Sequence, residues 1–147
     1  VAEINSKLKN RLRVSEGFRA KPYRCPAGKL TIGYGRNLED KGISRIEAEF
    51  LLDNDIAEAQ ALLRRYLPWT DNLDQARRDV LVDMVFNMGI GSAKTGKGLL
   101  SFQNALKHIQ RGEYAEAAFH MLDSRWAKQV GGRAEQLARI METGVEE

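Results

Sequence analysis

Residues 15–35 decide the fold of this chain, and they read SEGFRAKPYRCPAGKLTIGYG. Within them, Pro26-Ala27-Gly28 is a turn signal between two short runs that carry Tyr, Leu, Thr and Ile, a pattern typical of a β-hairpin. With the turn centred near Gly28, we expect Cys25 and Thr31 to lie directly opposite each other. Cross-strand partners point to the same face with Cβ atoms roughly 5 Å apart, so the thiol and the hydroxyl would share a space that holds a water.

A helical pattern precedes the hairpin. Ile4, Leu8 and Leu12 recur at every fourth residue among Lys, Arg and Asn, which predicts an amphipathic helix over residues 3–16. Glu16 is then the last residue of that helix. Its carboxyl group is expected at the junction between the helix and the first strand.

The spacing of three polar residues resembles a known catalytic pattern. Glu16, Cys25 and Thr31 are separated by eight and then five residues, as in the catalytic triad of the phage-type lysozymes, or endolysins. The glycine after Glu16, the Pro22-Tyr23 pair and the Thr-Ile-Gly-Tyr-Gly ending are similar to that family too. Taken singly, the three residues have ordinary alternatives: a solvated helix end, a small buried residue and a strand former. The joint spacing favours the catalytic interpretation.

The resemblance implies a role for each member of this triad. Glu16 is the general acid that protonates the glycosidic oxygen, while Cys25 and Thr31 hold the attacking water. Cys25 stands where the family more often has Asp, so a scheme with two carboxylates does not apply unaltered. The family pattern tolerates Cys at this position. We expect the positive charge of Arg19 or Arg24 to lower the pKa of the thiol.

The rest of the sequence predicts helices. Ser44-Arg45-Ile46-Glu47 is a capping box, so a helix is expected from Ser44 to about Tyr66, before Pro68. Apolar residues surround the axis of the next helix, which is typical of a helix at the centre of a helical lobe. The later helices are expected from Asp71 or Asp74 to Met88, over 99–110, over 113–122, and from about Gly131-Gly132 to Gly144.

The second half also resembles the phage-type lysozymes, so the likeness covers almost the whole chain. Residues 84–89 match the segment whose aromatic residue, here Phe86, lines the lip of the substrate cleft. Asn87 stands where the family often has Gln. Arg125 and Arg133 belong to a matching C-terminal segment, in which the second Arg approaches the catalytic Glu. The alternatives are a core aromatic for Phe86 and a solvated helix start for Arg133.

The expected fold is of the α+β class, mostly helical and lysozyme-like, with one domain over residues 1–147. A small N-terminal lobe of about 14–43 carries the hairpin, and a connecting helix covers about 44–66. The C-terminal helical lobe takes about 67–147 together with the helix at 3–16. The connecting helix would be roughly 30 Å long at about 1.5 Å per residue.

Charge points to a class of partner. The chain of 147 residues has a formal net charge of +3, and its excess of basic residues lies early, in residues such as Lys7, Lys9, Arg11 and Arg13. A basic face favours a polyanion, whether a cell-wall polymer, a lipid headgroup or a nucleic acid. Apolar content of 43% and charged content of 29% are ordinary for a globular protein.

Several kinds of site are not expected. A single cysteine forms no internal disulfide and no Cys cluster for zinc, and His108 and His120 lack a His-Glu-x-x-His pattern. We therefore expect no metal and no cofactor. No apolar run is long enough to span a membrane, and Val1-Ala2-Glu3 is not typical of a signal peptide.

The resemblance implies an enzyme that hydrolyses the β-1,4 bond between N-acetylmuramic acid and N-acetylglucosamine and so lyses bacterial cell walls. Its expected partners are peptidoglycan and the anionic wall surface, without nucleic acid or stable membrane insertion, and the chain is expected to be a monomer. It would be made in the host bacterial cytoplasm and act in the periplasm or wall. The alternatives are a lytic transglycosylase, a non-catalytic wall-binding module and a basic helical nucleic-acid binder.

Overall fold

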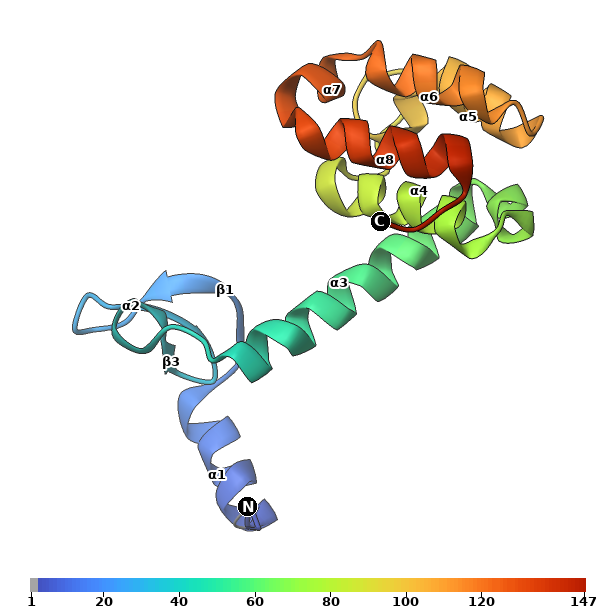
Figure 1. Cartoon of the computed structure of the whole chain (residues 1–147). Helices are drawn as coiled ribbons and strands as arrows, with labels where there is room; N and C mark the ends of the chain where they lie inside the picture. The colour runs from blue at the N-terminus through green and yellow to red at the C-terminus, as the bar shows by residue number, and fades with distance from the viewer. Residues whose placement is uncertain (1–2) are drawn as a thin grey trace. The chain divides into compact units, whose positions relative to one another are not determined.

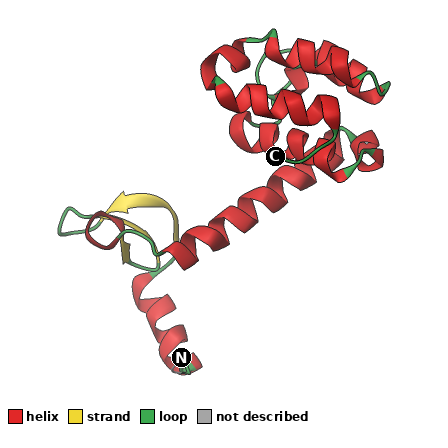
Figure 2. Cartoon of the chain, in the orientation of Figure 1, coloured by secondary structure: helices red, strands yellow, loops and turns green. Residues whose placement is uncertain are grey.

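The structure, a computed structural model, describes residues 3–147, so Val1 and Ala2 of the segment compared with a signal peptide lie outside it. The chain is mostly helical with one three-stranded antiparallel sheet, which confirms the expected α+β class (Figure 1). Figure 2 shows the strands confined to the N-terminal part. The chain divides into two compact units, of which the first ends at Phe50 and the second begins at Leu51.

The first unit begins with the expected helix, α1 (Ser6–Glu16). The Asn5 side chain caps it by accepting a hydrogen bond of 2.9 Å from the N–H of Lys7. Gly17 ends it with φ of 70° and donates its N–H to the carbonyl of Arg13 at 2.9 Å. The predicted end at Glu16 is confirmed, whereas the helix begins at Ser6, three residues later than predicted, because Asn5 caps it.

The sheet contains one irregular strand. Its strands are β1 (Arg19–Arg24), β2 (Leu30–Gly33) and β3 (Arg36–Asn37), in the order β1-β2-β3. Between the pairs Arg19–Gly33 and Tyr23–Thr31, β1 has three residues where β2 has one, so β1 bulges. Pro22 lies in this bulge, where its missing N–H breaks no regular ladder.

The hairpin turn is tighter than predicted. The Gly28 N–H donates to the Cys25 carbonyl at 2.7 Å, and the Cys25 N–H donates to the Lys29 carbonyl at 3.0 Å. Gly28 has φ of 80°, so a three-residue loop closes the hairpin with Cys25 beside Lys29. Tyr23 is the residue opposite Thr31, and the predicted direct opposition of Cys25 and Thr31 is wrong. The two are offset by two residues along one strand, which keeps their side chains on one face of the sheet.

A short helix that the sequence did not predict follows β3. This helix, α2 (Leu38–Lys41), supplies two carboxylates to basic residues of the hairpin. Arg24 pairs with Glu39 at 3.1 Å, and Lys29 pairs with Asp40 at 3.2 Å. Part of the early basic excess is therefore neutralised inside the first unit.

The capping box is confirmed at the start of α3 (Arg45–Tyr66). The Ser44 N–H donates to Glu47 Oε1 at 2.8 Å, and the Glu47 N–H donates to Ser44 Oγ at 3.1 Å. Arg36 also donates to Glu47 at 2.8 Å. These bonds lower the pKa of Glu47 to about 2, and the bond from Arg36 has the largest effect. The boundary between the two units falls inside α3, which ends before Pro68 as predicted.

The second unit is helical. Its elements are η1 (Pro68–Asn72), α4 (Gln75–Met88), η2 (Leu99–Ser101), α5 (Gln103–Gln110), α6 (Tyr114–Leu122), α7 (Arg125–Val130) and α8 (Gly132–Thr143). The prediction of one helix over 99–110 is wrong, because the N–H groups of Leu99 and Leu100 donate to the carbonyls of Gly89 and Ile90 at 3.0 and 2.9 Å. A regular α-helix therefore begins only at Gln103.

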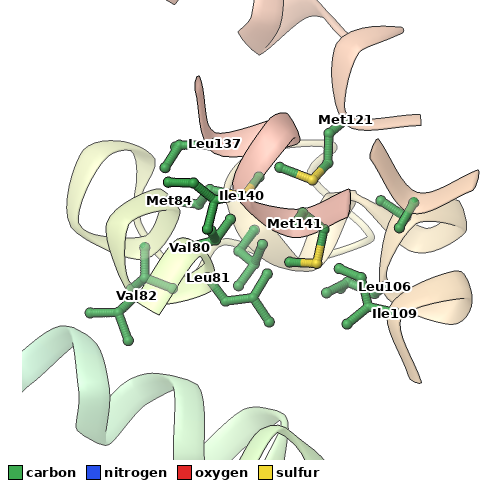
Figure 3. Packing of buried hydrophobic residues seen from close by; sticks show 14 of the residues in the cluster. Val80, Leu81, Val82, Met84, Leu106, Ile109, Met121, Leu137, Ile140 and Met141 are labelled. Carbon is green, nitrogen blue, oxygen red and sulfur yellow. The ribbon is translucent and has the colours of Figure 1, made fainter. Parts of the chain in front are cut away.

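The core of the second unit is built around α4, as its all-round apolar sequence predicted. Figure 3 shows Val80, Leu81 and Met84 of α4 packed among side chains that include Met121 of α6 and Met141 of α8. All five are at most 2% exposed. Full burial of such a side chain stabilises a fold by about 1.5–3 kcal/mol. The packing holds α8 against both α4 and α6.

Candidate active site

The three residues predicted to be catalytic all lie in the first unit. Glu16 ends α1, Cys25 directly follows β1, and Thr31 is the second residue of β2. The Glu16 carboxyl group reaches the turn between β2 and β3, where a Cβ on Gly35 would lie 2.6 Å from Glu16 Oε2. The helix end, the hairpin turn and the second strand thus each contribute one polar side chain.

Thr31 is buried beside the backbone of the hairpin turn. It is 4% exposed, and its hydroxyl donates to the Lys29 carbonyl at 2.8 Å. A hydroxyl group has one proton and two lone pairs, so this bond leaves the Thr31 oxygen free to accept a hydrogen bond from a water.

Cys25 is half-buried, and hydrogen bonds in the hairpin turn act on its thiol. The pKa of the Cys25 thiol is lowered from its ordinary value, and the largest cause is hydrogen bonding from the backbone of Lys29. The backbone of Ala27 and the side chain of Thr31 act in the same direction, while desolvation opposes them. The sulfur and the Thr31 hydroxyl are therefore neighbours, although they are not directly opposite.

The cause that we expected for this lowered pKa is wrong. The guanidinium of Arg19 stacks over the Tyr23 ring, 4.6 Å from its centroid. Arg24 donates to Glu39 and to the Gly28 carbonyl. Neither arginine is among the causes of the shift, because each charge is engaged elsewhere and the backbone of the tight turn supplies the donors instead.

The residues expected to bind or support the substrate lie in the second unit. Phe86 of α4 is 45% exposed, so it is not a core aromatic. Asn87 accepts a hydrogen bond of 3.0 Å from the indole N–H of Trp126. Arg133 is not simply solvated, because its guanidinium pairs with Asp83 of α4.

Arg125 borders a pocket of about 640 Å³ within the second unit. Trp126 and Phe102 also line this pocket, and their rings meet edge to face with centroids 5.8 Å apart. Lys97 and Asp123 also line it, so the walls combine aromatic surface with charges of both signs. Such a lining suits a ligand with both apolar and polar groups.

Sequence reasoning missed three residues at these sites. Trp126 and Asp83 hold Asn87 and Arg133 through contacts between distant segments, and Gly35 lies against the Glu16 carboxyl group. A physical signal existed for Trp126, because a buried indole N–H requires an acceptor, and Gly35 ends the Thr-Ile-Gly-Tyr-Gly motif.

Over residues 3–147, no group of three or more His, Cys, Asp or Glu side chains is arranged to hold a metal ion. Within the same range, no helix is both long enough and apolar enough to cross a membrane.

Comparison with known proteins gives a consistent result. A family model described as Phage lysozyme matches residues 13–142. The probable T4-type lysozyme 1 of Dictyostelium discoideum is 27% identical over 95% of this chain and 95% of its own length. The endolysin of Acyrthosiphon pisum secondary endosymbiont phage 1 is 32% identical over 86% of this chain and 82% of its own length. The pre-baseplate central spike protein Gp5 of Enterobacteria phage T4 is 26% identical over 95% of this chain but 28% of its own length.

Proposed function

This chain belongs to the phage lysozyme family and is a lysozyme-type, peptidoglycan-lytic enzyme, and from that premise we propose that it hydrolyses the β-1,4 bond between N-acetylmuramic acid and N-acetylglucosamine. The family match includes Glu16, Cys25 and Thr31. The observation that carries the proposal is that the Cys25 thiol, whose pKa the hairpin turn lowers, lies beside the buried Thr31 hydroxyl. A glycosidase needs such an acceptor for water together with a separate acid.

Glu16 is the proposed general acid. Its carboxyl group donates a proton to the glycosidic oxygen as the bond to the anomeric carbon breaks. Proton transfer from a positioned side chain contributes about 10²–10⁴-fold to a rate. Its place supports this role, because Glu16 is exposed at the end of α1 with its carboxyl group beside Gly35, where a substrate can reach it.

Cys25 and Thr31 are proposed to hold the attacking water. The water donates one hydrogen bond to the Thr31 oxygen and the other to the thiolate, which leaves a lone pair for the anomeric carbon. As the new C–O bond forms, the proton of the water passes to the sulfur, and the proton of Glu16 leaves with the departing sugar. Both protons are thereby accounted for, and the products carry ordinary reducing ends.

Phe86, Asn87, Arg125 and Arg133 are proposed to bind or support the substrate. The exposed ring of Phe86 offers a face to a sugar, and the bond between Asn87 and the Trp126 indole fixes one wall of the pocket beside Arg125. The proposed partner is peptidoglycan in the anionic wall of a bacterium. The enzyme is proposed to act as a monomer and to be made in the cytoplasm of that bacterium.

The decisive experiment replaces the acid. Glu16→Gln keeps the shape of the side chain but removes the transferable proton, so clearance of purified peptidoglycan should fall by at least about 10²-fold. Glu49→Gln, which removes an exposed carboxylate of α3, is the matched control and should retain full activity. A folded Glu16→Gln protein with near-normal activity would contradict the assignment.

The products distinguish the rival reaction. A lytic transglycosylase cleaves the same bond with the sugar's own 6-hydroxyl and leaves anhydro ends, and the lack of a carboxylate at Cys25 is the feature that favours it. Mass spectrometry of fragments released by the wild-type protein should find reducing ends only. Binding to walls without any loss of turbidity would instead identify a non-catalytic binding module.

A further inference from the structure

We propose that Gly35 is the positioning residue of the general acid, because its missing side chain leaves the space that the Glu16 carboxyl group occupies. The inference rests on the proposed role of Glu16. A Cβ on Gly35 would lie 2.6 Å from Glu16 Oε2, 3.1 Å from Cδ and 3.4 Å from Cγ. The end of the Glu16 side chain, with Oε2 nearest, therefore takes up the space that a side chain at position 35 would need.

The backbone alone does not explain this contact. The first unit has five glycines with positive φ, and they are Gly17, Gly28, Gly33, Gly35 and Gly42. At each of the other four, a Cβ would meet no described atom within 4 Å. Conformational freedom accounts for glycine at all five positions. Gly35 has a second reason to lack a side chain, and that reason is the carboxyl group of Glu16.

A methyl group at position 35 would displace the acid more than it would disturb the fold. Ordinary contact begins near 3.4 Å, so Oε2 must retreat by about 0.8 Å from its 2.6 Å position. The carboxyl group is the end of a flexible side chain, and it rotates away at less cost than backbone would move. A misplacement of about 1 Å costs a catalytic group roughly 10²-fold in rate.

The test compares two glycines of the same turn. Gly33 and Gly35 have φ of 69° and 76°, so Gly33→Ala and Gly35→Ala impose similar backbone strain and should lower the melting temperature alike. On soluble glycan fragments of peptidoglycan, kcat of Gly35→Ala should be roughly 10²-fold below that of Gly33→Ala, with KM little changed. The side-chain carboxyl carbon resonance of Glu16, assigned by its loss in Glu16→Gln, should shift in Gly35→Ala only.

The outcomes separate this inference from the proposed function. If Glu16→Gln is inactive while Gly35→Ala matches Gly33→Ala in kcat and in the Glu16 resonance, the inference about Gly35 is overturned and the function stands. If Glu16→Gln is active, the proposed function fails whatever Gly35 does. Should either alanine variant fail to fold, Gly33→Asn and Gly35→Asn repeat the comparison, because Asn tolerates positive φ better than Ala. Equal kcat and equal resonances in that pair would also overturn the inference.

Discussion

Replacement of Cys25 by Ser, Ala and Asp would show whether the sulfur acts as a base or only fills space. The turn should survive all three changes, because its bonds use the backbone N–H and carbonyl of Cys25, not the side chain. The side chain is half-buried at the end of a hairpin, so little core volume is lost. Differences in rate would then report the chemistry of position 25.

The structure sets the expected order of rates. Ser keeps a hydrogen bond to the water but does not ionise, so Cys25→Ser should lose the base contribution of about 10²–10⁴-fold. Cys25→Ala also loses that hydrogen bond, which is worth a further factor of about 2–12. Cys25→Asp restores a charged acceptor and should keep or raise the activity. The expected order is Asp at least equal to Cys, then Ser, then Ala.

The pH dependence gives a second measure of the same idea. The mechanism needs the Cys25 thiolate together with the Glu16 proton, so one limb of the wild-type pH–rate profile should fall at the pKa of Cys25, which the turn holds below the ordinary thiol value. Cys25→Asp should lose this limb, because a carboxylate is already ionised there. The assay is turbidity loss of purified walls between pH 5 and pH 9, after circular dichroism has verified folding.

Alkylation provides the independent control. Iodoacetamide should abolish wild-type activity by filling the water site, and it should leave Cys25→Asp unaffected because that variant contains no cysteine. If alkylated wild type and Cys25→Ala both clear walls at the normal rate, Cys25 is a packing residue. The reasoning from the lowered pKa to a base would then be refuted.

Two further predictions concern charge. The carboxyl pKa of Glu47 is lowered from its usual value of 4.5 to about 2, so its stabilising effect is complete above pH 4.5 and is lost as pH falls through about 2. The melting temperature of Glu47→Gln should thus lie below that of wild type at neutral pH and converge with it near pH 2. A difference in melting temperature that stays the same at every pH would argue against this linkage. If Lys7 and Lys9 steer the enzyme to an anionic wall, activity should fall as the Debye length shrinks to about 10 Å at 0.1 M salt. Replacing both with Gln should reduce this salt dependence, and a wild-type rate independent of salt would assign the two charges to solubility alone.

Helix ends could be predicted where short-range hydrogen bonds determine them. The capping box at Ser44 and Glu47 involves residues three apart, so the motif itself specified the start of α3. The same holds for α1 and Gly17, where a glycine with positive φ closes the last turn. The central position of α4 could also be predicted, because its apolar residues, Val80, Leu81 and Met84 among them, lie on more than one side of the helix.

Features that depend on distant or detailed geometry could not be predicted. The hairpin register depends on the φ of Gly28, and moving the turn centre by one residue placed Cys25 beside Lys29. The split of the predicted helix near Phe102 depends on bonds to a loop some ten residues earlier. For the candidate site, the spacing identified the triad, but the source of the lowered thiol pKa lay in backbone donors that no pattern of side chains reveals.

The bulge in β1 also bears on how one molecule meets another. β1 is an edge of the sheet, and an exposed edge normally offers unpaired N–H and carbonyl groups to a strand of a second molecule. Here Pro22 has no N–H to offer, and the bulge interrupts the repeat of donors and acceptors. Arg19 and Lys21 add like charges along the same strand. Two copies that approach along β1 would repel each other before any strand pairing began. The irregularity that shapes the hairpin therefore also protects the protein from sheet-to-sheet aggregation at high concentration.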